Sequence, residues 1–212
     1  MTKMKAYELF DNTQWRPNWK QIGDYVSYDY EKKDNTMLIF FQPSNEKIDW
    51  IRNFSFRKKP YKDMEIEYKV HGGFLKAWKE VEDKIGEIIA DKTIKKIVIS
   101  GYSHGGALAA FCHEYCWFHR PDIRDNIVGY GFEAPRIFGS RKVPDNLKER
   151  WQNFTVIRTS NDIVTQLPPL CFCHVGQFLH LDKHQKYGPF TSHRPQMVFW
   201  AVRYQMKDID II

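Results

Sequence analysis

A serine lies between two glycines where the flanking residues predict first a strand and then a helix. Residues 101–105 read Gly-Tyr-Ser-His-Gly, after the apolar run 97–99 and before an alanine-rich stretch. A serine on such a turn projects its hydroxyl above the sheet edge, and the glycines let strand and helix approach closely. This pattern favours a nucleophilic Ser103 that attacks an acyl carbon, with the helix N-terminus facing the anion that forms. The alternative is a glycine-rich turn whose serine merely caps the helix.

A nucleophilic serine needs a general base and an acid that orients the base. On this kind of turn, they follow the serine in the order acid, then histidine. Asp162 fits the acid because it follows the strand predicted over 154–158, although aspartates are also common in ordinary turns. Four histidines follow Asp162: His174, His180, His184 and His193. The first two fall in a segment predicted to be extended, where a structural role is expected. His193, on a loop before the last predicted helix, is favoured over His184 as the base.

Hydrophobic periodicity predicts the elements that must hold these residues. Strands are predicted over 25–30, 37–41, 65–70, 127–132 and 154–158, besides the strand before Ser103. Helices are predicted after Ser103 and over 74–89, 144–151 and 194–205, with 171–181 extended and 45–61 irregular. Strands that alternate with helices indicate a mostly parallel central sheet flanked by helices on both faces. We expect one domain over residues 1–212.

Composition restricts the classes of function. The chain has 212 residues, of which 42% are hydrophobic, too many for a disordered protein. The net charge of +6 is spread among acidic residues, so no nucleic-acid partner is predicted. No apolar run could span a membrane, and the first residues lack the apolar core of a secretory signal. A cytoplasmic location is therefore expected, unless a leader has been lost.

The four cysteines do not predict a metal site. Cys112 and Cys116 are one helical turn apart, and Cys171 and Cys173 would share one face of a strand. A site that joins them to His113 or His174 is conceivable, but these spacings differ from those of zinc sites. Buried small apolar residues are the favoured interpretation, and neither a metal nor a cofactor is predicted.

Five segments occur in a recognisable order. They are Val-His-Gly-Gly-Phe at 70–74, Gly-Tyr-Ser-His-Gly-Gly-Ala-Leu-Ala at 101–109, Phe-Glu-Ala-Pro-Arg at 132–136, Asn-Asp-Ile-Val-Thr-Gln-Leu-Pro-Pro at 161–169 and His-Val-Gly at 174–176. In this order they resemble the class 3 (fungal-type) lipases. The resemblance implies an α/β-hydrolase fold, with Ser103 as nucleophile, Asp162 as acid and His193 as base. It also implies a serine carboxylic-ester hydrolase that works through an acyl-enzyme.

The oxyanion hole has candidates of two kinds. The backbone N–H of His104, directly after the nucleophile, is one donor by geometry. By the resemblance, Ser44 is the second, because Phe-Gln-Pro-Ser at 41–44 occupies the place of the family's Phe-Arg-Gly-[Ser/Thr]. Here Gln-Pro replaces Arg-Gly. An alternative is His71-Gly72-Gly73, which is similar to the oxyanion loop of other esterases but leads into a helix.

The aromatic and basic segment 45–61 lies where related lipases carry a lid. It is interpreted either as an amphipathic flap that contacts a lipid surface transiently, or as core residues beside a loop. Short acyl esters, glycerides and phospholipids all fit as substrates, and the sequence does not indicate the oligomeric state. A non-catalytic lipase-like binding protein and an acyltransferase or peptidase on the same fold are the alternative functions.

Overall fold

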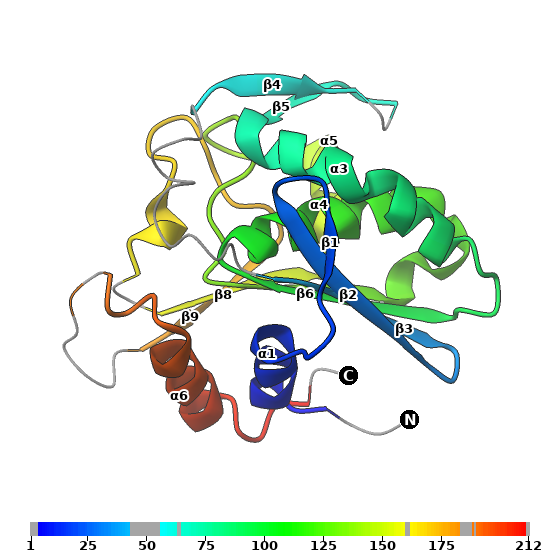
Figure 1. Cartoon of the computed structure of the whole chain (residues 1–212). Helices are drawn as coiled ribbons and strands as arrows, with labels where there is room; N and C mark the ends of the chain where they lie inside the picture. The colour runs from blue at the N-terminus through cyan, green and yellow to red at the C-terminus, as the bar shows by residue number, and fades with distance from the viewer. Residues whose placement is uncertain are drawn as a thin grey trace.

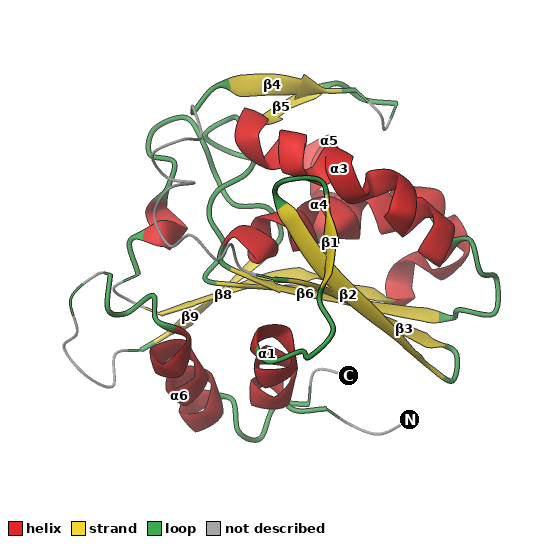
Figure 2. Ribbon diagram, in the orientation of Figure 1, coloured by secondary structure: helices red, strands yellow, loops and turns green. Residues whose placement is uncertain are grey.

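A seven-stranded sheet forms the centre of the molecule (Figures 1 and 2). The computed structural model describes residues 4–42, 56–62, 65–159, 162–182, 188 and 190–210. The strands, in spatial order, are β1 (Lys20–Ile22), β2 (Val26–Lys33), β3 (Thr36–Phe41), β6 (Lys96–Tyr102), β7 (Ile127–Phe132), β8 (Phe154–Thr159) and β9 (Gln177–Leu181). From β3 to β9 neighbouring strands are parallel, and β1 and β2 add an antiparallel edge. The predicted mostly parallel sheet is confirmed.

Helices cover both faces of this sheet. α1 (Ala6–Gln14) and α6 (Pro195–Gln205) lie on one face, and α3 (Gly72–Ile89) and α4 (His104–His119) lie on the other (Figure 1). The short helix α5 (Asp145–Lys148) continues into the 3-10 turn Glu149–Trp151, and further 3-10 turns are Pro121–Asn126 and Val164–Gln166. All six residues of β3 are buried, because a strand covered on both faces has no solvated side.

A two-stranded ribbon lies beyond α3, outside the main sheet (Figure 1). It pairs β4 (Lys58–Tyr61) with β5 (Tyr68–His71) in antiparallel register. The segment predicted to be irregular therefore ends in a strand, and the strand predicted over 65–70 begins later. In both β4 and β5, the run of alternating apolar and polar residues is too short to show where the strand begins and ends. β5 leads directly into α3, which begins at Gly72.

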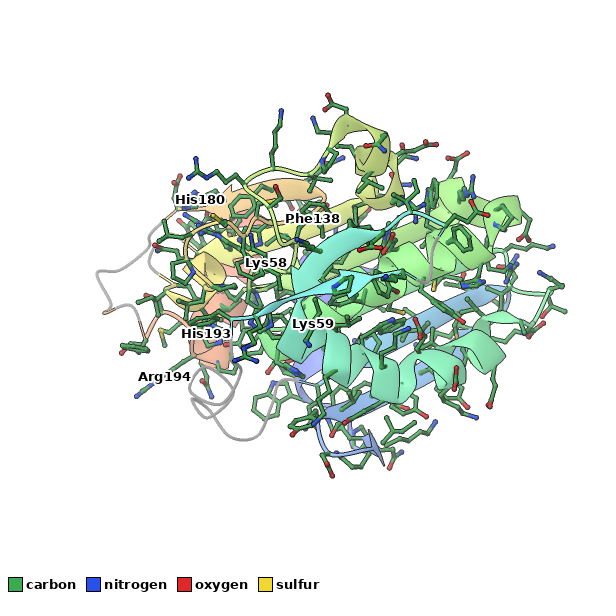
Figure 3. All side chains as sticks on the ribbon, turned by 90° about the horizontal axis from the view of Figure 1, so that it is seen from above. Lys58, Lys59, Phe138, His180, His193 and Arg194 are labelled. Carbon is green, nitrogen blue, oxygen red and sulfur yellow. The ribbon has the colours of Figure 1, made fainter. Side chains whose placement is uncertain are left out.

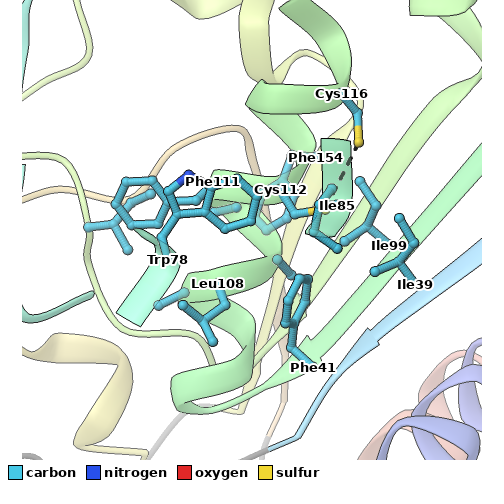
Figure 4. Close-up of a cluster of buried hydrophobic side chains, with 14 of the residues drawn as sticks. Ile39, Phe41, Trp78, Ile85, Ile99, Leu108, Phe111, Cys112, Cys116 and Phe154 are labelled. Carbon is cyan, nitrogen blue, oxygen red and sulfur yellow. Dashed lines mark hydrogen bonds between the residues drawn. The ribbon is translucent and has the colours of Figure 1, made fainter. Parts of the chain in front are cut away.

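Two hydrophobic clusters hold the layers together. In the larger one, Ile39, Phe41 and Ile99 of the sheet pack among side chains of α3 and α4, such as Ile85 and Leu108 (Figure 4). The smaller cluster fills the opposite face, where α1 and α6 meet the sheet. The strands that carry the candidate serine and acid are thus fixed from both sides.

The segment of Cys171 and Cys173 departs from the prediction. It is not a strand before β9, and Leu170 and Cys171 adopt positive φ values of 44° and 61°. Cys171 is exposed rather than buried, whereas Cys112 and Cys116 are buried in α4 with their sulfur atoms 4.0 Å apart. Within the described part of the chain, no three His, Cys, Asp or Glu side chains gather as metal ligands.

Candidate active site

Ser103 occupies a strained turn between β6 and α4. Its backbone has φ 57° and ψ −121°, a conformation that residues other than glycine rarely adopt. Its N–H donates to the carbonyl oxygen of Phe132 at 2.9 Å, and its own carbonyl oxygen accepts from Gly106 N–H at 2.9 Å. These bonds tie the turn to β7 on one side and to α4 on the other. The side chain is thereby held at the end of the strand, as a nucleophile elbow requires.

Close backbone packing explains the two glycines of the motif. A Cβ on Gly101 would lie 2.0 Å from the carbonyl oxygen of Gly105. A Cβ on Gly105 would lie 2.3 Å from the carbonyl oxygen of Phe41, the last residue of β3. Both neighbours are backbone atoms, which cannot move aside cheaply. The sequence-based explanation, that strand and helix approach too closely for a side chain, agrees with this geometry.

His193 bridges the serine and the acid. Its Nε2 lies 2.8 Å from Ser103 Oγ, and its Nδ1 is hydrogen-bonded to Asp162 Oδ2. The imidazole sits in a turn before α6, where Ser192 N–H donates to the Gly188 carbonyl oxygen at 2.9 Å. The side chain of His193 is 19% exposed and that of Asp162 fully buried. The site is thus open to solvent at the histidine and dry at the acid.

Tyr102 supports the histidine. Its ring stacks on that of His193, with 5.1 Å between ring centroids and 20° between the planes, and its hydroxyl donates to the His193 carbonyl oxygen. Burial raises the pKa of Tyr102 well above 10, so the hydroxyl remains a neutral donor. One side chain therefore fixes both the imidazole face and the backbone of the turn.

Asp162 is fixed by the turn that follows it. Its Oδ1 accepts from Val164 N–H at 2.8 Å, and its carbonyl oxygen accepts from Thr165 Oγ1 at 2.9 Å. These two bonds tie Asp162 to the start of the 3-10 turn Val164–Gln166, and its other carboxylate oxygen is hydrogen-bonded to His193. The acid comes from the loop after β8, where the sequence placed it.

Of the candidate oxyanion-hole donors, His104 lies within the described residues and Ser44 does not. His104 is the first residue of α4, so its backbone N–H belongs to the positive end of that helix. Ser44 lies outside the described residues; the carbonyl oxygen of Gln42, the last described residue before it, would lie 2.8 Å from a Cβ on Gly105. In the alternative loop, His71 N–H donates to the Ile137 carbonyl oxygen and Gly72 N–H to that of Arg57. These two N–H groups are therefore already occupied by backbone acceptors.

Four other histidines that the structure describes lie in surroundings that suit a structural role. His174 Nε2 lies 2.8 Å from the Thr165 carbonyl oxygen, and His180 lies on β9, well apart from His193 (Figure 3). Burial lowers the pKa of His71 and of His104 to about 4, so both are neutral near pH 7. His184 lies outside the described residues, as do residues 45–55 of the expected lid segment 45–61.

Two residues of this site were missed by sequence analysis, Tyr102 and Glu133. Tyr102 was treated only as the variable position of the serine motif, and Glu133 only as part of the Phe-Glu-Ala-Pro-Arg segment. The sequence carries no signal for either role, because the burial of a glutamate directly after an apolar strand is seen only in the structure.

A parallel sheet with a strained serine after one strand, an aspartate after another and a histidine before the last helix defines the α/β-hydrolase class of fold. The chain belongs to the class 3 lipase family, whose model, described as "Lipase (class 3)", matches residues 38–172. The match confirms the family that the five motifs resembled. This family consists of hydrolases of the lipase type.

Individual relatives agree with this family. The chain is 32% identical over 163 residues to secreted mono- and diacylglycerol lipase 1 of Fusarium solani, a match that covers 71% of this chain and 44% of that protein. It is 28% identical over 157 residues to a lipase of Rhizomucor miehei, covering 68% and 41%. The solved triacylglyceride lipase of Rhizomucor miehei superposes with a TM-score of 0.66 at 22% identity, over 78% of this chain and 65% of that one. The chain spans less than half the length of the two curated relatives.

The relatives correct one prediction. A cytoplasmic location was expected from the sequence, but the Fusarium relative is a secreted lipase, and this overturns the expectation. As a separate finding, no helix among the described residues is long and apolar enough to cross a membrane.

Proposed function

We propose that the protein is a serine carboxylic-ester hydrolase in which Ser103 is the nucleophile, His193 the general base and Asp162 the acid that orients the base. The observation that carries this proposal is the continuous hydrogen-bonded chain from Ser103 Oγ through His193 to Asp162. A serine that only capped α4 would need neither the strained backbone nor a histidine on its hydroxyl. In fact Ser103 makes no side-chain cap of α4.

The reaction follows from the three contacts. His193 Nε2 takes the Ser103 proton while Oγ attacks the ester carbonyl carbon, and the imidazolium then protonates the departing alcohol. Water, activated by the same nitrogen, hydrolyses the acyl-enzyme and releases the acid. Asp162 holds the proton on Nδ1, so that Nε2 is the basic nitrogen, and stabilises the imidazolium.

The tetrahedral intermediate carries an oxyanion, which needs hydrogen-bond donors. We propose the backbone N–H of His104 as one donor and Ser44 as the other. Loss of one donor in such a hole costs about 10²- to 10³-fold in rate. The positive end of α4 adds a favourable field at the same place.

Lipid acyl esters are the proposed substrates. The Fusarium relative is named for mono- and diacylglycerols, which supports acylglycerols as the first class to test. Its name also supports a site of action outside the cytoplasm. Transient contact with a lipid surface stays part of the proposal, as does the single-domain organisation.

The test is a fluorophosphonate probe together with esters of increasing acyl length. Wild type should be labelled at Ser103 and should hydrolyse at least one ester. Ser103→Ala should lose the label and about 10⁴- to 10⁶-fold of kcat, the range found for nucleophile removal in other triads. Ser140→Ala, which changes an exposed serine, is the matched control and should behave as wild type.

Two outcomes would overturn the proposal. Full ester turnover by Ser103→Ala would exclude Ser103 as nucleophile. A wild-type protein that binds acylglycerols but neither hydrolyses esters nor takes the label would be a non-catalytic binding protein.

A further inference from the structure

Glu133 stands directly after β7 in a conformation that glutamate rarely adopts. Its φ is 49°, in the left-handed region, and its side chain is fully buried. Its backbone N–H donates to the Ile157 carbonyl oxygen of β8 at 2.8 Å. A carboxyl group that is both buried and placed on a strained backbone requires specific partners.

One carboxyl oxygen has an obvious partner and the other does not. Oε1 accepts from Thr159 N–H, at the end of β8, at 2.7 Å. Oε2 is buried and, as a carboxylate oxygen, has no donor among the described residues. The carboxyl group of Asp162 is its neighbour: Thr159, which donates to Glu133, also accepts from Asp162 N–H at 3.4 Å, and Asp162 raises the pKa of Glu133. Two carboxylates cannot hydrogen-bond to each other, so one of the two must carry a proton.

The surroundings decide which carboxyl group keeps the proton. Asp162 already accepts from Val164 N–H and from the His193 imidazole, and both donors stabilise a negative charge there. Among the described residues, Glu133 has only neutral donors, both from Thr159, and is otherwise buried. Burial and the neighbouring Asp162 raise the pKa of Glu133 well above 4.5. The proton therefore resides on Glu133.

We propose that Glu133 is a positioning residue of the triad: as a neutral carboxylic acid it donates its Oε2–H to the Asp162 carboxylate and fixes that carboxylate against His193. This inference rests on the proposed triad. It assigns a role in catalysis to a residue that does not touch the substrate, the serine or the histidine.

The other groups near Glu133 leave it as the one that holds a proton. Asp162 faces it from the loop after β8, and Tyr102 lies near it at the end of β6. The pKa of Tyr102 is raised well above 10, so Tyr102 stays neutral. His193 lies beyond Asp162 and contacts its far oxygen. Within the described part of the chain, Asp162 is thus the charged group that Glu133 meets.

Protonation of Glu133 has a measurable effect on stability. In the unfolded chain a glutamate ionises near its ordinary pKa, whereas in the folded protein Glu133 keeps its proton to higher pH. Wild type must therefore become less stable relative to Glu133→Gln as pH rises above about 4.5. Below that pH the two proteins should differ little.

The experiment compares Glu133→Gln with Glu133→Met. Glutamine keeps an acceptor for Thr159 and a donor for Asp162, whereas methionine has a similar length and offers neither. In ester hydrolysis, Gln should retain kcat within about 3-fold. Met should lower kcat by about 10- to 100-fold, the effect of losing a hydrogen bond to a charged group, with KM nearly unchanged. The rate of fluorophosphonate labelling should follow kcat.

Three results would overturn the inference. Wild-type kcat in Glu133→Met would leave Glu133 with a packing role alone. Equal losses in Met and Gln would mean that an ionised carboxylate is needed. Parallel stability curves of wild type and Glu133→Gln between pH 5 and about 8 would mean that Glu133 is not protonated. Failure of the proposed function looks different: wild type itself would lack turnover and labelling, while urea denaturation would still report the Glu133 proton.

Discussion

At the scale of single residues, the side chains proposed to react differ from the side chains that orient them. Ser103 and His193 carry the proposed bond-making and proton transfer, and the His193 imidazole is partly exposed to solvent. Asp162, Tyr102 and Glu133 are buried behind them. Each side chain that reacts is therefore oriented by a buried side chain that takes no direct part in the reaction.

The assignment of the base can be tested directly. His193→Ala should lower kcat by about 10⁴- to 10⁶-fold, because it removes the proton acceptor on Ser103 Oγ. His184→Ala is the matched variant and should retain near-normal rates. Ester hydrolysis under saturating substrate measures both. An inactive His184 variant beside an active His193 variant would reverse the assignment.

The support from Tyr102 predicts a smaller effect. Tyr102→Phe keeps the ring stacked on His193 but loses the hydrogen bond to its carbonyl oxygen. We expect kcat to fall by about 3- to 10-fold, with a slightly lower melting temperature, since one neutral hydrogen bond is lost. Tyr204→Phe, which changes an exposed tyrosine of α6, serves as control. Unchanged kcat would mean that the ring alone positions the histidine.

The sequence predicted the reactive residues better than the supporting ones. Ser103 is marked by its own neighbours, and Asp162 by the strand before it. His193 could be favoured only by its loop, because its contacts lie 90 and 31 residues away. Glu133 and Tyr102 could not be assigned, since their roles depend on which residues the sheet brings beside them. Ser44 and His184 stay predictions.

At the scale of elements, the crossing of β6 and α4 sets the geometry of the elbow. Strand, turn and helix follow one another without a spare residue, because α4 begins at the residue after Ser103. The local pattern therefore predicted this element well. By contrast, α1 and β1 were not predicted. α1 is mostly polar and is secured by tertiary contacts, such as the 2.6 Å hydrogen bond between Thr13 Oγ1 and Ser100 Oγ of β6.

The crossing of β6 and α4 predicts that Gly101 does not tolerate a side chain. Gly101→Ala would place a methyl group 2.0 Å from the Gly105 carbonyl oxygen, so the helix must shift. We expect a loss of at least about 2 kcal/mol in the free energy of unfolding and a large loss of activity. Gly188→Ala is the control, because no described atom lies within 4 Å of its added methyl group. Equal stability of the two variants, measured in urea, would contradict this packing.

At the scale of the whole molecule, the interior contains a second ionisable cluster away from the site. Arg150 Nη1 lies 2.8 Å from Glu114 Oε1, and Tyr68 donates to the other oxygen of Glu114. Burial raises the pKa of Glu114 to about 7 despite these partners. The cluster joins α4 to the ribbon strand β5 and to the turn after α5, and it could not be predicted because its members lie far apart in the chain.

This cluster predicts a pH effect on stability. Between about pH 4.5 and 7, Glu114 is protonated in the folded protein and ionised in the unfolded chain, so stability falls as pH rises. Glu114→Gln should remove a fall of roughly 3 kcal/mol over this range. Urea denaturation at several pH values measures it, with the exposed Glu149→Gln as control. A Glu114→Gln curve parallel to that of wild type would contradict the raised pKa.

The wide spacing of the triad along the chain has a consequence for folding. Ser103 and His193 are 90 residues apart, and His193 reaches the serine only when α6 and the turn before it have docked on the sheet. Helices form in microseconds, whereas contacts between distant residues form late. During refolding, helical circular dichroism should therefore recover before the Ser103 hydroxyl reacts with a fluorophosphonate. The rate of covalent labelling would then report the last step of folding. A chain diluted out of denaturant would regain its secondary structure before it regained ester hydrolysis.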